Sequence, residues 1–152
     1  MPIAQTATGG FGFDDWEQDP AAMTHPLDAP GTWARLDGSG DVSVSRRLIG
    51  GCIETLSNLT GTASGDLAGF ARDHAPEGLL FCIEADQESS YDIGRRLHGM
   101  KLAGWFADAN AILVGCTSAS DQPDPSQHAA VLDALGELNW STDAKSLTQT
   151  LT

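Results

Sequence analysis

The stretch Gly78-Leu-Leu-Phe-Cys-Ile-Glu84 decides the fold. Gly78 bounds an uninterrupted apolar run on one side, and Glu84 is the first charged residue on the other. An apolar run of this length between such boundaries is more typical of a strand buried at the centre of a sheet than of a helix, which needs more residues. We therefore predict a buried strand here and interpret the rest of the chain around it.

Downstream, residues 90–106 form the strongest predicted helix, because apolar residues recur at helical spacing with charged residues between them. The run Ala111–Val114 predicts a second buried strand, which Gly115 ends. Ser126 is a good N-cap residue for a further helix that runs to Leu138. A strand, a helix, a strand and a helix thus follow one another.

Upstream, the alternation in residues 42–45 predicts a strand that runs into residues 48–49 and is broken by Gly50-Gly51. Residues 52–59 carry apolar side chains at helical spacing, and residues 66–74 read as a short helix that Pro76 stops. Helices that alternate with short apolar strands indicate an α/β domain. Such domains place functional groups in the loops at the strand ends.

The two ends of the sequence differ from this central part. Residues 1–41 are rich in Gly, Pro, Asp and Thr, and we expect a loop-rich N-terminal segment with one short strand at Thr32–Leu36. Residues 42–138 form the predicted domain. Residues 139–152 are polar and without a strong pattern, so we expect a divergent, disordered tail.

Composition excludes several classes of function. The 152 residues include 8 Lys and Arg against 21 Asp and Glu, a formal net charge of −13. A field of that sign repels nucleic acid and anionic membrane surfaces, so neither is expected as a partner. Residues 1–12 lack the basic start and apolar stretch of a signal peptide, and no apolar run is long enough to span a membrane. We expect a cytoplasmic protein.

The three cysteines, Cys52, Cys82 and Cys116, are too widely spaced for a CxxC metal site. Cys82 lies in an apolar run and Cys116 directly after one, so buried and unreactive thiols are the expectation. Reduced thiols agree with a cytoplasmic location. The histidines also lack metal-ligand spacing, and we expect neither a metal nor a cofactor.

Four segments together resemble the C-terminal domain of the peptidase S66 family, which includes bacterial LD-carboxypeptidases and microcin C immunity proteins. They are RLIGGCIETLSNLTGT (47–62), GLLFCIEADQES (78–89), HGMKLAGWF (98–106) and ANAILVGCT (110–117). The resemblance covers residues 13–138. It implies a small mixed sheet with flanking helices, of the swivelling β/β/α type. The loop around Trp16 and Trp33 is more similar to the microcin-immunity branch.

The resemblance also implies a chemistry. Family members hydrolyse an amide bond to a carboxyl-terminal residue with Ser, His and Glu, the serine lying in an N-terminal domain and the other two in the C-terminal domain. By resemblance Glu84 is the triad acid, whose carboxylate holds the imidazole in the right tautomer and stabilises its cation. The implied substrates are peptides or aminoacyl nucleotides. A strand-terminal Glu that meets only solvent or an arginine is the alternative.

The chain departs from the family pattern in three places. No domain that could carry the serine precedes residue 13, and Ser43, Ser45 and Ser57 lie in segments that resemble the acid-bearing domain. The segment after Leu138 contains no His. Arg46 stands where the family has glycine. We therefore expect the chain alone to be inactive.

The remaining histidines and tryptophans are weaker candidates. His25, His74, His98 and His128 read as surface or helix-end residues, and none is nominated as the base. Trp16 and Trp33 either stack on a ring of the substrate or fix the long loop to the domain. Trp105 is expected in the core or an interface.

Three interpretations stay open. The first is a degenerate or truncated S66 hydrolase. The second is a non-catalytic module that binds a peptide or a nucleotide. The third is a subunit that completes a separate nucleophile domain or self-associates through the apolar surface left uncovered.

Overall fold

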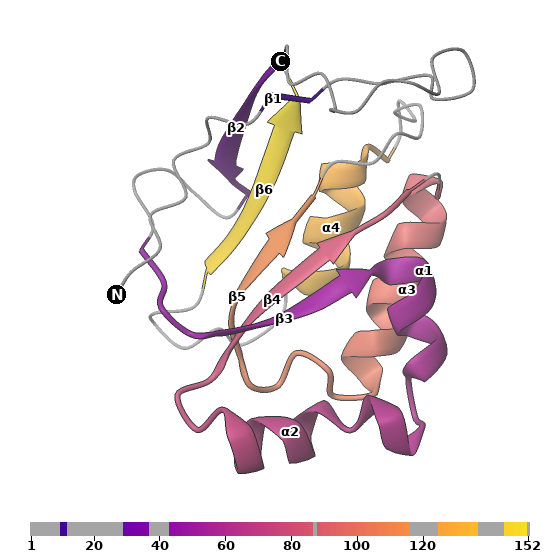
Figure 1. Cartoon of the computed structure of the whole chain (residues 1–152). Helices are drawn as coiled ribbons and strands as arrows, with labels where there is room; N and C mark the ends of the chain where they lie inside the picture. Colours follow the sequence, from indigo (N-terminus) through magenta and orange to yellow (C-terminus); the bar gives the residue numbers. More distant parts are fainter. Residues whose placement is uncertain are drawn as a thin grey trace, which may run out of the picture.

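In the computed structural model the chain folds into a six-stranded mixed sheet with helices packed against it (Figure 1). The structure describes residues 10–11, 29–36, 43–86, 88–115, 125–136 and 145–151. The strand order is β1-β2-β6-β5-β4-β3. Neighbours from β3 to β6 are parallel, whereas β2 is antiparallel to β6 and β1 to β2. The expected α/β class and small mixed sheet are confirmed. The bounds are β1 Gly10–Phe11, β2 Ala29–Arg35, β3 Arg47–Cys52, β4 Leu79–Glu84, β5 Ala109–Val114 and β6 Lys145–Leu151.

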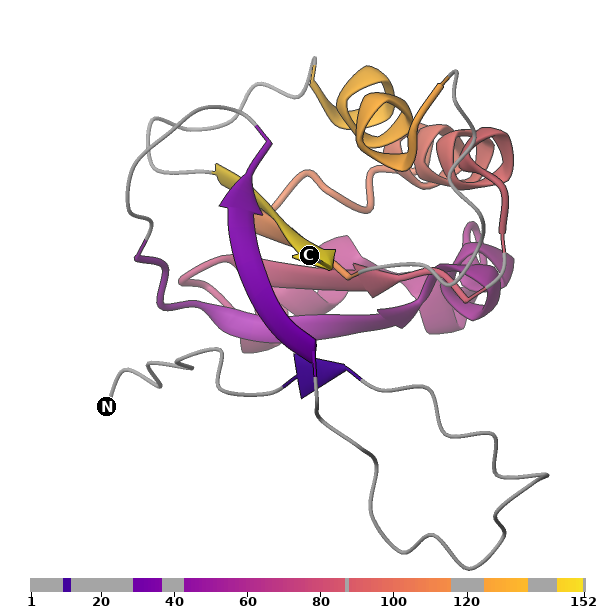
Figure 2. The same ribbon diagram turned by 90° about the horizontal axis from the view of Figure 1, so that it is seen from above.

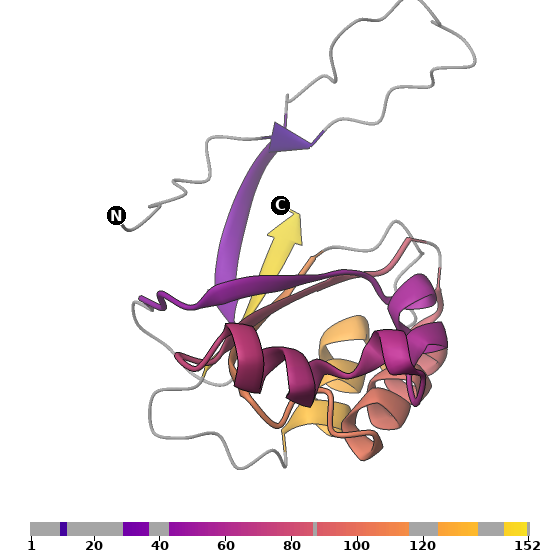
Figure 3. The same ribbon diagram turned by 60° about the horizontal axis from the view of Figure 1, so that its bottom comes forward.

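The helices lie mainly on one side of this sheet. Figure 2 shows α3 and α4 together above one face, and Figure 3 shows α2 across the bottom of the molecule. The order of elements agrees with the sequence prediction, although α3 and α4 end earlier than expected. The strand expected from residue 42 begins only at Arg47, and Gly50-Gly51 do not break it, because both glycines pair with β4. The helix expected over residues 52–59 is a single turn, α1, followed by a 3-10 turn, η1. The bounds are α1 Ile53–Leu56, η1 Ser57–Leu59, η2 Ala63–Gly65, α2 Leu67–His74, α3 Ser90–Leu102 and α4 Gln127–Leu135.

The strand predicted at the centre of the sheet, β4, has the burial that its sequence suggests, although it lies second from the edge, between β5 and β3. In β4 the side chains of Leu79, Phe81 and Ile83 are buried and point to the face that carries the helices, while those between them are half-buried. The ring of Phe81 meets those of Trp105 and Phe106 edge to face, with centroid distances of 6.1 and 5.3 Å. Trp105 is therefore a core residue. This packing fixes β4 and the position of the glutamate that ends it.

The C-terminal residues differ from the disordered tail that we expected. Lys145–Leu151 forms β6, which pairs with β5 on one side and β2 on the other. Its two neighbours supply hydrogen-bond partners for the backbone, so β6 does not depend on a strong apolar pattern of its own. The strand expected at Thr32–Leu36 belongs to β2. Trp16, His25 and Cys116 lie outside the described residues, as does the side chain of Trp33.

Candidate functional site

The carboxyl ends of three parallel strands meet at one edge of the sheet, where α/β proteins place functional groups. Cys52 ends β3 and lies in register with Glu84, which ends β4. Gly115 follows β5, and its amide donates to the carbonyl oxygen of Ile83 over 2.8 Å. A β-carbon on Gly115 would lie 3.3 Å from that of Glu84. Glu84 therefore lies between Cys52 and a glycine that leaves room beside it.

The side chain of Glu84 is exposed, and within the described part of the chain it makes no hydrogen bond or ion pair. The arrangement agrees with the sequence prediction that the first charge after the apolar run ends the central strand. It also leaves the carboxylate free to accept a hydrogen bond from a group that approaches this edge. Three of the histidines are in the described part of the chain, and none of them pairs with Glu84.

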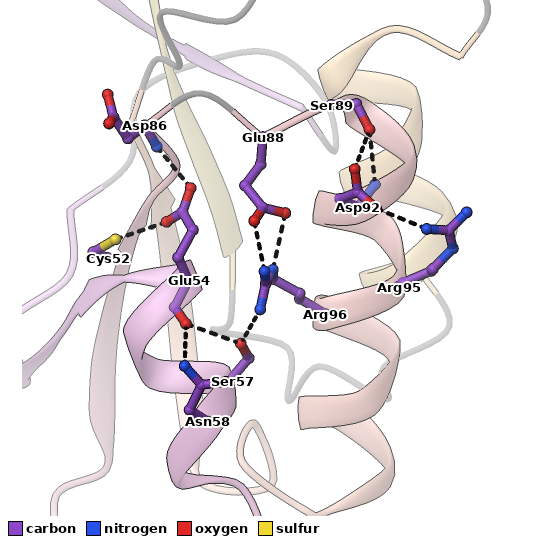
Figure 4. Close-up of polar contacts among 10 residues, drawn as sticks. All are labelled: Cys52, Glu54, Ser57, Asn58, Asp86, Glu88, Ser89, Asp92, Arg95 and Arg96. Atoms are coloured by element: carbon purple, nitrogen blue, oxygen red, sulfur yellow. Dashed lines mark hydrogen bonds and ion pairs between the residues drawn. The ribbon is translucent and has the colours of Figure 1, made fainter.

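Glu54, in the first turn of α1, joins the ends of two strands (Figure 4). Its Oε2 accepts a hydrogen bond from Sγ of Cys52 over 2.7 Å, and its Oε1 accepts one from the backbone amide of Asp86 over 2.9 Å. Asp86 lies two residues beyond Glu84. The carboxylate of Glu54 thus holds the end of β3 and the segment that leaves β4 against each other.

This environment lowers the pKa of Glu54 below its ordinary value. Burial is the largest influence and by itself raises the pKa, but hydrogen bonds from the Cys52 thiol and from the amides of Glu54 and Asp86 outweigh it. The positive charge of Arg96 acts in the same direction as these bonds. The carboxylate therefore stays ionised to a more acidic pH than a free glutamate.

Arg96, in the middle of α3, makes a second connection across this edge (Figure 4). Its guanidinium forms a bidentate pair with Glu88, at 2.9 and 2.5 Å, and also donates to Oγ of Ser57 over 2.7 Å. The hydrogen bond and the charge of Glu88 raise the pKa of Arg96, so the pair stays ionised. Residues from η1, from α3 and from the segment before α3 are thereby held together.

We expect the Arg96–Glu88 pair to stabilise the fold by more than a surface ion pair. The two side chains are 31% and 18% exposed, so a double-mutant cycle with Arg96→Met and Glu88→Gln should give a coupling energy of about 1–2 kcal/mol. The control is the pair Arg95–Asp92 on the same helix, which is 75% and 45% exposed and should give below about 0.5 kcal/mol. Equal couplings in urea denaturation would contradict the prediction.

The start of α3 is fixed by capping. Ser89 accepts a hydrogen bond from the amide of Asp92 over 3.3 Å and donates its own hydroxyl to the Asp92 carboxylate over 2.6 Å. The Asp92 side chain accepts a further bond from Arg95 over 2.7 Å. The connection from Glu84 to α3 is therefore anchored at its far end as well.

Two thiols lie near this edge. Cys52 and Cys82 are free and half-buried rather than fully buried. Burial, and after it the negative charge of Glu84, raises the pKa of Cys82 and keeps that thiol protonated. The sequence does not predict that either thiol contacts a carboxylate, but Cys52 donates a hydrogen bond to Glu54. The described residues contain no group of three or more His, Cys, Asp or Glu side chains placed to hold a metal ion.

The histidines in the described part of the chain lie on helices. Nε2 of His98 is 3.1 Å from a carboxylate oxygen of Asp133 on α4, and the ring of His74 contacts that of Phe70 at 5.4 Å. His128, in the first turn of α4, is half-buried. His98 and His74 thus have the surface or helix-end positions that the sequence predicts.

The sequence did not reveal the roles of Glu54, Glu88 and Arg96. In the sequence, Glu54 looks like an ordinary polar residue of a short amphipathic helix. Its partner Asp86 lies 32 positions further along the chain. Glu88 and Arg96 are eight residues apart and span a helix start, a spacing that no helical rule links. Only the sheet topology shows that these residues meet.

Parallel strands whose carboxyl ends meet at one edge of the sheet, with helices packed on one face, define an α/β domain. The family model for the LD-carboxypeptidase C-terminal domain matches residues 45–144. The chain therefore belongs to the peptidase S66 family through its C-terminal domain. A search of curated protein sequences finds no significant match.

Solved structures share the fold. A muramoyltetrapeptide carboxypeptidase from Oxalobacter formigenes matches 80% of this chain at 18% identity with a TM-score of 0.52. An MccF-like protein from Streptococcus pneumoniae in complex with AMP matches 76% of it at 20% identity with a TM-score of 0.46. The match covers 40% of the first of these proteins and 34% of the second. This chain therefore spans less than half the length of the solved relatives.

Proposed function

We propose that this chain is the acid-bearing part of a serine-type LD-carboxypeptidase-like hydrolase that cleaves an amide bond to a carboxyl-terminal residue. The observation that carries the proposal is the position of Glu84, which ends the buried strand β4, is exposed and has no partner within the described residues. Membership of the S66 family supports the same assignment.

In this role the Glu84 carboxylate accepts a hydrogen bond from one imidazole nitrogen of a histidine. The bond holds the ring in the tautomer whose other nitrogen takes the serine proton, and the negative charge stabilises the imidazolium that results. A carboxylate at the end of a packed strand suits this role because its backbone is held rigidly. Gly115 beside it leaves space for the incoming ring.

In this proposal the serine and the histidine come from outside the described residues. No histidine among the described residues pairs with Glu84, and the serines of this region lie in acid-domain segments. Another part of a longer polypeptide or a separate chain would supply them. The proposed substrates are peptides ending in a D-amino acid or aminoacyl nucleotides of the microcin type. The free thiols of Cys52 and Cys82 suit a reducing compartment such as the cytoplasm.

None of the helices among the described residues is long and apolar enough to cross a membrane.

The first test uses the purified chain alone. We expect no release of D-alanine from a muramoyl tetrapeptide and no cleavage of an aminoacyl-adenylate analogue, because a triad without its nucleophile and base loses orders of magnitude in rate. Turnover above the buffer control that survives further purification would contradict the proposed incompleteness.

The second test asks whether Glu84 occupies the position of the acid. In a chimera, residues 47–115 of this chain replace the matching segment of the Oxalobacter formigenes enzyme, whose own remaining residues stay in place. We expect the chimera to release D-alanine from the tetrapeptide. A smaller graft of residues 79–89 serves if the larger one does not fold. Loss of activity in a graft that folds by circular dichroism would count against the proposal.

A further inference from the structure

The carboxylate of Glu54 has both of its oxygens engaged at the edge of the sheet where β3, β4 and β5 end. Oε1 of Glu54 accepts the Asp86 amide and Oε2 accepts the Cys52 thiol, over 2.9 and 2.7 Å. These two donors come from the ends of adjacent strands, and Cys52 is the register partner of Glu84. Glu54 therefore connects the residue beside Glu84 with the residue two positions after it.

The segment that follows Glu84 is held at several further points. Ala85 is buried, Glu88 forms a hydrogen-bonded ion pair with Arg96, and Ser89 caps α3. Figure 4 shows the Glu54 and Arg96 contacts side by side, between α1 and α3. Among the side-chain hydrogen bonds described for this segment, the bond from the Asp86 amide to Glu54 is the one nearest in sequence to the proposed acid. A charge-assisted bond of this kind is roughly twice as strong as a neutral one.

We propose that Glu54 is a positioning residue for Glu84: its carboxylate fixes the backbone two residues after the acid and ties it to the side chain of Cys52, the register partner of the acid, and so sets the direction from which Glu84 meets an imidazole. This inference rests on the proposed function for the role of Glu84. The coupling between Glu54, Asp86 and Glu84 is itself a property of the chain alone, and it is measurable without any substrate.

The chemistry of the carboxylate makes the proposal specific. An ionised carboxylate only accepts hydrogen bonds, and here both of its oxygens face donors. In Glu54→Gln one oxygen becomes an NH₂ group, which must then face either the Cys52 thiol or the Asp86 amide, donor against donor. The variant keeps the size of the side chain but removes the charge and one of the two bonds.

The test is NMR spectroscopy of the full chain labelled with ¹⁵N and ¹³C. In Glu54→Gln we expect the Asp86 amide to exchange with solvent about tenfold faster and its proton resonance to move upfield, because its acceptor is weakened. The amide and side-chain resonances of Glu84 should shift as well. Glu77→Gln is the matched control, since Glu77 undergoes the same chemical change at the opposite end of β4.

A pH titration of the unmodified chain tests the same link without depending on whether a variant folds. It gives a result that a general loss of stability would not produce. The Asp86 amide proton and the side-chain carboxyl carbon of Glu54 should titrate together, with one midpoint below the ordinary value for glutamate, because this amide donates to the Glu54 carboxylate, whose pKa is lowered. Cys52, Asp86 and Arg96 are the groups that face the Glu54 carboxylate. The shared midpoint should disappear in Glu54→Gln.

Unmoved Asp86 and Glu84 signals in Glu54→Gln, or equal changes in Glu77→Gln, would overturn the inference. Independent titration midpoints for the Asp86 amide proton and the Glu54 carboxyl carbon would do the same. An inactive chimera together with intact coupling would instead reject the proposed function. The two failures are therefore distinguishable.

Discussion

Glu84→Gln in the active chimera is expected to lower kcat about 10³- to 10⁴-fold, while KM changes little. The amide of Gln still forms a hydrogen bond to an imidazole, but it carries no charge to stabilise the cation, and it can hold the ring in the wrong tautomer. Because Glu84 is exposed and has no partner in the described part of the chain, the substitution should leave the thermal unfolding temperature nearly unchanged.

The matched control for this experiment is Glu77→Gln in the same chimera. Glu77 pairs with Arg47 before the start of β4, and both side chains are about half exposed, so its loss should change kcat less than about twofold. Steady-state release of D-alanine measures both variants. If Glu84→Gln keeps more than a tenth of the activity, the residue is not the triad acid.

Gly50→Ala is expected to abolish cooperative folding of the chain. Gly50 lies in β3 at φ +152°, and a β-carbon there would overlap the backbone of Cys82 in β4. Because the obstacle is the backbone of a paired strand, it cannot rotate away as a side chain can. We expect a loss of more than about 3 kcal/mol, a large fraction of the stability of a domain of this size.

The neighbouring glycine provides the control. Gly51 has the same φ of +152°, but a β-carbon on it would only approach Leu56 at 4.0 Å. Gly51→Ala should therefore cost only the backbone strain, about 1–3 kcal/mol. Urea denaturation followed by circular dichroism measures both variants. Equal destabilisation would show that strain alone, and not the close approach of β3 to β4, makes glycine necessary at position 50.

The central elements could be predicted because their signals are local. The apolar run that ends at Glu84 gave β4, the spacing of Ile93, Leu97 and Met100 gave α3, and Asp66 is the N-cap of α2, accepting from the Gly69 amide at 2.8 Å. In each case a few adjacent residues determine the structure, so the sequence pattern carries the information.

The missed features depend on contacts between distant residues. β6 has weak apolar patterning and exists because β5 and β2 supply its hydrogen-bond partners. The link from Glu54 to Asp86 appears only when β3 and β4 lie side by side, and the same holds for the approach of Arg96 to Ser57. Glu84 itself was found through the family resemblance, since a glutamate at a strand end is otherwise unremarkable.

The position of β6 has a consequence for biosynthesis. Residues 29–35 emerge early from the ribosome, yet in the sheet they are joined to β5 only through residues 145–151, which lie between them, with Gly31 opposite Leu151. The β3–α3–β5 region can form while translation continues, whereas the early strand must wait for more than a hundred residues to be added. Such distant pairing is slow to form, and until then β2 exposes a backbone edge that a chaperone or a second nascent chain could bind.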